Sequence, residues 1–137
     1  YADAATELDT FVALTGSVEQ HPVLMDCARA AGDYARVEEL WSELAATSPS
    51  GALVVEGRIV LAGALADQGR VRDAIARLER RAAPPRQPRE HHLRLWYALA
   101  DLYERAGEMP RARALFEQVR RHDPGFADTA ERLAALS

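Results

Sequence analysis

Lysine and asparagine are absent from this 137-residue chain, and cysteine occurs once, as Cys27. A single cysteine cannot form an internal disulfide, so nothing requires an oxidising compartment and a cytoplasmic location is expected. The chain also lacks an uninterrupted apolar run of the roughly 18–20 residues that span a bilayer. No basic-then-apolar signal peptide opens it. We therefore expect neither a membrane-spanning helix nor a membrane partner.

Catalytic and metal-binding patterns are missing as well. The four histidines, His21, His91, His92 and His122, form no H-E-x-x-H pattern and have no cysteine partner, which argues against a metal site. Cys27 lacks the adjacent base that a nucleophile needs, and no glycine-rich phosphate loop follows a strand. The sequence predicts a protein that is not an enzyme and carries no cofactor.

Charge is unevenly distributed along the chain. Residues 1–50 hold 9 acids and 2 arginines, whereas residues 51–94 hold 5 acids and 9 arginines. An acidic front and a basic middle could steer partners toward the chain. The total of −4 argues against general nucleic-acid affinity.

Two sets of apolar residues with helical spacing lie between residues 96 and 119. Each set follows the spacing 0, 3, 4 and 7: Trp96, Leu99, Ala100 and Tyr103, then Ala112, Leu115, Phe116 and Val119. Such spacing places a set on one face of an α-helix. Gly107 lies between the two sets and suits the left-handed conformation that ends a helix, and Pro110 suits a helix start. The segment predicts a helical hairpin.

Similar hairpins surround two earlier glycines. Gly32, Gly69 and Gly107 are 37 and 38 residues apart, and apolar sets with helical spacing flank each of them. The earlier sets are Leu24, Met25 and Ala28, then Val37, Leu40, Trp41 and Leu44, and around the second glycine Leu61, Ala62, Leu65, Ala74, Ile75 and Leu78. Three helix pairs therefore repeat along the chain.

The last pair resembles the tetratricopeptide repeat family, whose pattern is W-x2-L-G-x2-Y, then A-x3-F, then P. It reads Trp96-x2-Leu99-Ala100-x2-Tyr103, Ala112-x3-Phe116 and Pro124, departing only in Ala100. In the first pair Val37-x3-Trp41 replaces A-x3-F, Pro49 is in place, and His21 stands at the tryptophan position. In the middle pair Arg58 stands there. The resemblance implies an all-α right-handed superhelix with a concave groove lined by the first helix of each pair.

We expect one domain over residues 1–137, with about eight helices and no strands. Residues 1–17 hold an orphan helix of a truncated repeat, residues 18–50 repeat 1, and residues 51–92 repeat 2 with a proline-rich insertion at Pro84–Pro88. Residues 93–125 form repeat 3, and residues 126–137 a capping helix with Phe126, Ala130, Leu133 and Ala134 facing inward. Because the chain begins with Tyr1 rather than Met, a piece of a longer protein is one interpretation.

The helical geometry indicates which residues would face the groove. These are Tyr97, Arg94, Asp101 and Arg105 in the last pair, Glu56 and Ile59 in the middle pair, and Asp26 in the first. Glu104, Gly63, Asp67 and Arg29 share these faces. Tyr97 lies one residue off the core stripe, so both a groove contact and packing against a neighbour stay open. Many proteins of the family that this chain resembles hold a peptide's C-terminal carboxylate with paired Lys, Arg and Asn on these faces, and that clamp is absent here because the chain has no Lys or Asn.

Two functions from different classes remain. The first is a non-catalytic scaffold that binds a protein or peptide partner in the groove. The second is a structural module that self-associates as a homodimer, or packs on the rest of a longer chain, through exposed end helices, with Leu8 and Phe11 as the contact residues.

The basic stretch from Arg77 to Arg94 carries a further alternative. Its arginines could bind phosphate or an acidic peptide, because guanidinium groups suit both. The same residues would also be favourable as a solvated helix end.

Overall fold

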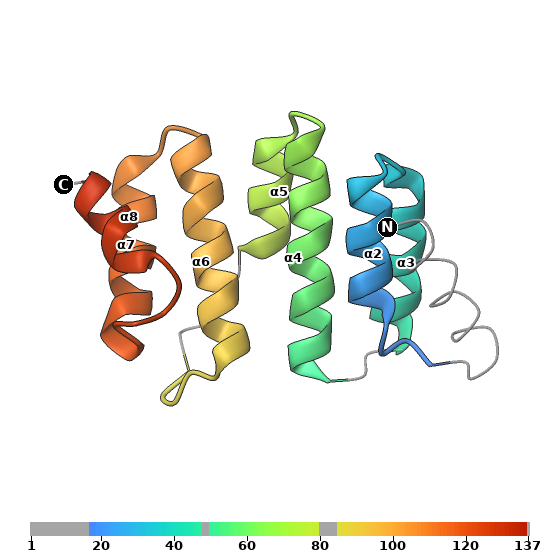
Figure 1. Ribbon diagram of the computed structural model, residues 1–137, viewed down its shortest axis with the longest axis horizontal. Helices are drawn as coiled ribbons and strands as arrows, with labels where there is room; N and C mark the ends of the chain where they lie inside the picture. The colour runs from blue at the N-terminus through green and yellow to red at the C-terminus, as the bar shows by residue number, and fades with distance from the viewer. Residues whose placement is uncertain (1–16, 48–49, 80–84, 137) are drawn as a thin grey trace. The chain divides into compact units, whose positions relative to one another are not determined.

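The computed structural model describes residues 17–47, 50–79 and 85–136. These residues form seven helices and no strand, which confirms the predicted all-α fold. The helices are α2 (His21–Ala30), α3 (Tyr34–Thr47), α4 (Gly51–Asp67), α5 (Val71–Leu78), α6 (Glu90–Arg105), α7 (Met109–His122) and α8 (Thr129–Leu136) (Figure 1). The expected helix with Leu8 and Phe11 lies outside the described residues. The handedness of a superhelix stays a prediction.

The chain divides into two compact units, Tyr1–Gln68 and Gly69–Ser137. The boundary falls in the turn between α4 and α5, inside the second predicted helix pair. The single domain expected over residues 1–137 stays a prediction.

The core of the first unit is shared by α2, α3 and α4. Five buried side chains, Leu24, Met25, Val37, Leu40 and Leu44, come from the α2–α3 hairpin, and Leu61 and Ala64 of α4 complete the cluster. Ser50 caps α4 by accepting a hydrogen bond from the Leu53 amide, at 3.1 Å, which satisfies one of the helix's unpaired N–H groups. The third helix is therefore part of this core.

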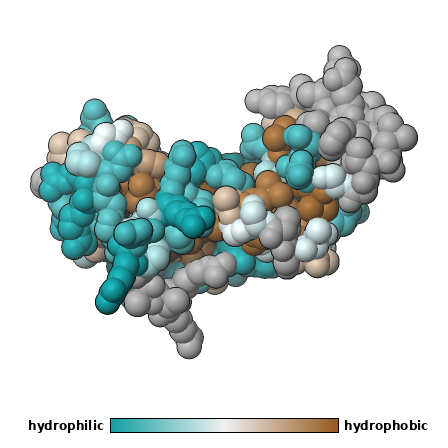
Figure 2. All heavy atoms as spheres, turned by 90° about the horizontal axis from the view of Figure 1, so that it is seen from below, coloured by the Kyte–Doolittle hydropathy of each residue, from teal (hydrophilic) through white to brown (hydrophobic). Residues whose placement is uncertain are grey.

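Two glycines let α4 approach its neighbours closely. A Cβ atom at Gly57 would lie 2.3 Å from Leu44 Cδ2, so α3 leaves it no room, and it would be in van der Waals contact with Met25 Sδ of α2 at 3.5 Å. A Cβ atom at Gly63 would lie 2.3 Å from the guanidinium of Arg29 on α2. Other residues of α4, among them Val54, Ile59 and Val60, are only half-buried. Figure 2 shows hydrophobic side chains at the surface of the first unit on the face in view.

The second unit is built around the α6–α7 hairpin. Trp96, Leu99 and Tyr103 of α6 are buried, as are Phe116 and Val119 of α7. The side of α6 predicted to form the core is thus confirmed. Helix α5 packs against α6, and α8 packs against α7 (Figure 1). Arg72 of α5 forms an ion pair with Glu108 at the start of α7.

The last helix differs from its prediction. It begins at Thr129 rather than 126, and Ala130 and Ala134, predicted to face inward, are exposed. Leu133 is buried as predicted, and Thr129 is buried with it. The late start has a local cause: the loop from residue 123 continues through Ala127, which has a positive φ of 47°. The shorter helix therefore turns a different side toward α7.

The turns within the helix pairs lie at the three predicted glycines. Gly32, Gly69 and Gly107 have φ angles of 75°, 78° and 81°, the left-handed region that favours glycine. Trp41, expected in the core, is only half-buried. Its ring lies 5.6 Å from the guanidinium carbon of Arg58. A cation–π contact thus joins two of the residues that depart from the motif.

Candidate interaction site

The predicted groove residues lie on the first helices of the pairs, at different depths. Asp26 of α2 and Arg94 and Arg105 of α6 are exposed, whereas Glu56, Ile59, Tyr97 and Asp101 are half-buried. The structure brings Tyr97, Asp101 and Arg105 together on one side of α6. Because Asp26, Glu56 and Ile59 belong to the first unit, a single groove that joins them to α6 stays a prediction.

Helix α6 positions its polar side chains by its period. Leu93, Trp96, Leu99, Ala100 and Tyr103 occupy the buried side. The positions one residue later than the buried ones, 97, 101 and 104, therefore emerge on an adjoining side of the same helix. This polar side has three oxygen-bearing groups within two turns.

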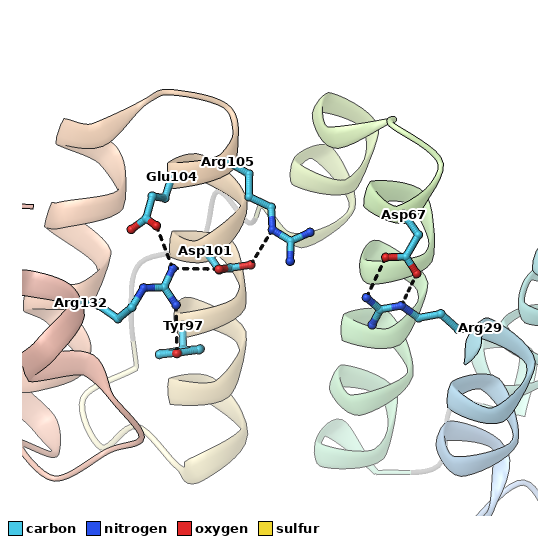
Figure 3. Close-up of polar contacts among 7 residues, drawn as sticks. All are labelled: Arg29, Asp67, Tyr97, Asp101, Glu104, Arg105 and Arg132. Carbon is cyan, nitrogen blue, oxygen red and sulfur yellow. Dashed lines mark hydrogen bonds and ion pairs between the residues drawn. The ribbon is translucent and has the colours of Figure 1, made fainter. Parts of the chain in front are cut away.

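Arg132 of α8 joins these groups (Figure 3). Its Nη2 donates to Asp101 Oδ1 at 2.8 Å and to Glu104 Oε2 at 3.3 Å, and its Nη1 donates to the Tyr97 hydroxyl at 3.2 Å. Arg105 pairs with the other oxygen of Asp101 at 3.2 Å. The polar side of α6 therefore holds one guanidinium group among several acceptors, and that group comes from this chain's own last helix.

Aromatic rings surround the same guanidinium. Its central carbon lies 5.0 Å from the centre of the Phe116 ring and 5.7 Å from that of Tyr97, distances at which a cation is attracted to a ring face. The Tyr97 ring meets Phe116 edge to face at 5.5 Å, and its hydroxyl donates to Asp128. These contacts support one of the two interpretations of Tyr97 left open by the sequence, packing against neighbours, and a groove contact stays a prediction.

These contacts shift the pKa values of the groups involved. Burial by itself lowers the pKa of Arg132, but the hydrogen bond to Asp101 and the charge of Glu104 raise it above its usual value. Burial raises the pKa of the Tyr97 hydroxyl, and the hydrogen bond to Asp128 raises it further. At neutral pH both groups keep their protons, so Arg132 stays a cation and Tyr97 a neutral phenol.

A second guanidinium contact lies in the first unit. Arg29 of α2 donates to both oxygens of Asp67 on α4, with Nε to Oδ2 at 2.7 Å and Nη2 to Oδ1 at 3.1 Å (Figure 3). Its guanidinium passes over Gly63, where a side chain would collide with it. The Asp67 hydrogen bond raises the pKa of Arg29. In each unit, then, an arginine bridges from the surface of one helix to carboxylates on another.

Sequence reasoning missed Arg132, Asp128 and the Arg29–Asp67 pair. Arg132 and Asp101 are 31 positions apart, and no motif links them. Arg29 and Asp67 were assigned to the correct faces, but nothing in their spacing of 38 indicated contact. The sequence contained one indication of the Arg29–Asp67 contact: the two residues have opposite charges and were expected on neighbouring first helices.

The structure describes part of the basic stretch from Arg77 to Arg94, in the second unit. Arg77, Arg86, Arg89 and Arg94 are exposed, while Arg80 and Arg81 lie outside the described residues. The rings of His91 and His92 are 4.1 Å apart, and His122 of α7 lies 5.8 Å from Trp96. Neither of its two interpretations is tested by these contacts.

Metal sites and membrane-spanning helices are the other features that the described residues bear on. Within the ranges 17–47, 50–79 and 85–136, no three or more His, Cys, Asp or Glu side chains are placed to hold a metal ion. Among the helices of those same ranges, none combines the length and apolarity needed to cross a bilayer. Cys27, in α2, is buried.

Comparison with known families supports the resemblance found in the sequence. Residues 93–136 match the tetratricopeptide repeat family, a match that spans most of α6, all of α7 and α8. It therefore includes Tyr97, Asp101, Glu104 and Arg132. Comparison with curated proteins found no match.

Proposed function

We propose that this chain, a tetratricopeptide repeat protein by its residues 93–136, is a non-catalytic scaffold that binds a protein or peptide through the first helices of its pairs. Repeats of this family generally mediate protein–protein interaction. The proposed contact residues are Tyr97, Arg94, Asp101 and Arg105 in the second unit, and Asp26, Glu56 and Ile59 in the first.

The division of α6 into two sides carries the proposal. One side is fully committed to the core, and the other presents charged groups that the core does not need. The side chains of Asp101 and Arg105 keep 30% and 51% of their surface exposed, so both retain the capacity for a further hydrogen bond. Partly exposed, geometrically fixed charges of this kind give specificity and faster association to a protein interface.

Site-specific photo-crosslinking tests which helices meet the partner. A photoreactive residue is placed at Arg94 or at Asp26, both exposed on first helices, and at Arg121 or Glu38, both exposed on second helices, as matched controls. We expect the same cross-linked partner from the first-helix positions and not from the controls. Cross-links confined to Arg121 and Glu38 would overturn the proposal, because the binding face would then be on the second helices.

Self-association is the second candidate function, and one observation favours it. The first unit, residues 1–68, carries 11 acids and 3 arginines, for a net charge of −8, whereas residues 69–137 carry 10 acids and 14 arginines, for a net charge of +4. Opposite net charges favour pairing between copies. Light scattering across a dilution series at low and high salt tests this, with Leu8→Glu/Phe11→Glu as the variant predicted to separate the copies. A monomer at every concentration and salt would exclude it.

A further inference from the structure

The contacts of Arg132 have the composition of an arginine-recognition site. Three oxygen acceptors, on Tyr97, Asp101 and Glu104, converge on one guanidinium, and two rings lie beside it. A planar guanidinium with five donors can satisfy several acceptors and stack on rings at once, which the compact ammonium of lysine cannot do. The acceptors reside on α6, and the Phe116 ring belongs to α7, so the α6–α7 hairpin supplies the whole receptor.

The helix that fills this receptor is short and buries few side chains. Helix α8 has eight residues, of which Thr129 and Leu133 are the buried ones, and helices this short are marginal without tertiary support. Its docked position also carries two local costs. The Thr129 hydroxyl is buried without a hydrogen-bond partner, and Ala127, just before the helix, has a left-handed φ of 47°. Both costs are relieved when α8 leaves the hairpin.

We propose that the α6–α7 face around Tyr97, Asp101 and Glu104 recognises an arginine on a helical segment of the partner, and that α8 occupies this site in cis until the partner displaces it. This inference rests on the proposed function and names the chemistry of the partner in the second unit. Helix α8 itself supports a partner helix with an arginine, because α8 is a short helix with one arginine on the side that meets α6.

The affinity for a partner depends on α8, because α8 occupies the site within the same chain. A tethered segment competes at an effective concentration in the millimolar range, so the intact chain presents a largely filled site. Removing the Arg132 guanidinium weakens the internal competitor and leaves Tyr97, Asp101 and Glu104 unchanged. The Arg132→Gln variant should therefore bind an external arginine helix better than the wild type does.

The experiment uses the full chain and a labelled peptide with the sequence of residues 123–136, DPGFADTAERLAAL, measured by fluorescence anisotropy. We expect Arg132→Gln to bind this peptide at least about tenfold more tightly than the wild type, because the cis competitor is weakened. A peptide with lysine in place of the arginine should bind at least about tenfold more weakly. Adding Asp101→Asn to the Arg132→Gln chain should also weaken binding.

Two results would overturn the inference. One is equal affinity for the arginine and lysine peptides, or no saturable binding, by an Arg132→Gln chain whose circular dichroism matches the wild type. The other needs no variant: hydrogen exchange of α8 amides as slow as that of α7 amides in the wild type would make α8 a permanent part of the fold. If the peptides fail while photo-crosslinks from Arg94 and Asp26 persist, the inference falls and the proposed function stands.

Discussion

The substitution Gly57→Ala should destabilise the first unit, although alanine is the better helix former. The new Cβ would lie 2.3 Å from Leu44 Cδ2, far inside van der Waals contact. Leu44 and Met25 are both fully buried, with 0% exposure, so neither can move toward solvent to make room. Either Leu44 leaves its rotamer or α4 shifts away from the α2–α3 hairpin.

The magnitude follows from two opposing effects. An extra methyl in a well-packed core typically costs about 1–3 kcal/mol, while glycine to alanine in a helix interior contributes about 1 kcal/mol of stability. The rigid surroundings of Gly57 place the cost toward the upper end, for a net loss of about 1–2 kcal/mol in the free energy of unfolding. For a chain of this size such a loss lowers Tm by roughly 3–8 °C.

Gly63→Ala is the matched control on the same helix. Its Cβ would meet the end of the Arg29 side chain, which is long, flexible and 30% exposed, and which can swing into water. The lost Arg29–Asp67 pair is partly exposed and contributes about 0–1 kcal/mol. The gain in helix propensity offsets this, so Gly63→Ala should be neutral within about 0.5 kcal/mol.

Fluorescence separates the two outcomes. The chain has two tryptophans, Trp41 in the first unit and Trp96 in the second, and Trp96→Phe leaves Trp41 as the reporter beside Gly57. Urea denaturation is then followed by Trp41 emission in both alanine variants. If Gly57→Ala is as stable as Gly63→Ala, or more stable than its parent, the close approach of α4 to α3 is refuted.

Three further outcomes are expected. Burial lowers the pKa of His92, and the charges of His91 and Arg89 lower it further. The contribution of His92 to stability is therefore present above pH 6.5 and is lost as pH falls from there toward the lowered pKa of the folded state. His92 Nδ1 accepts a hydrogen bond from the Arg89 amide at the start of α6, at 2.9 Å, so His92→Gln, which keeps an acceptor there, should lessen the acid loss in melting experiments across pH. Burial raises the pKa values of Tyr97 and Tyr103, and hydrogen bonds to Asp128 and Glu79, respectively, raise them further. Spectrophotometric titration should therefore show two phenols that ionise above the usual pH of about 10. Replacing either tyrosine with phenylalanine should remove one of these two transitions. Glu43→Ala leaves Nε2 of the buried His21 without its partner at 2.9 Å and should cost about 1–3 kcal/mol in urea denaturation. A loss below about 0.5 kcal/mol would mean that the bond adds nothing.

Local patterns were sufficient to predict the helix pairs. The 0, 3, 4 and 7 spacing identified the buried sides of α6 and α7, because burial in a helix follows its period. Glycine positions fixed the turns, since the left-handed conformation found at Gly32, Gly69 and Gly107 is costly for other residues. Each of these inferences depends on residues within one turn or one hairpin of each other.

Longer-range contacts were not predictable in this way. The phase of α8 depends on where the preceding loop ends, and the left-handed Ala127 gave no sequence signal. The bond from Arg132 to Asp101 depends on how α8 lies on the hairpin, which the pattern of either helix alone does not specify. Of the residues predicted for the groove, Tyr97, Asp101 and Arg105 share one side of α6, as the helical period implies, but their internal partner Arg132 was missed.

The sharing of α4 with the α2–α3 core has a consequence for anyone who transplants parts of this chain. A fragment cut at the repeat boundary, residues 18–50, would lose Leu61 and Ala64 and expose the side chains that they cover. A fragment that ends at Gln68 keeps that core whole. The smallest fragment that keeps a complete core is therefore a hairpin together with the helix that follows it. Chimaeras joined at the glycine turn should express better than those joined between repeats.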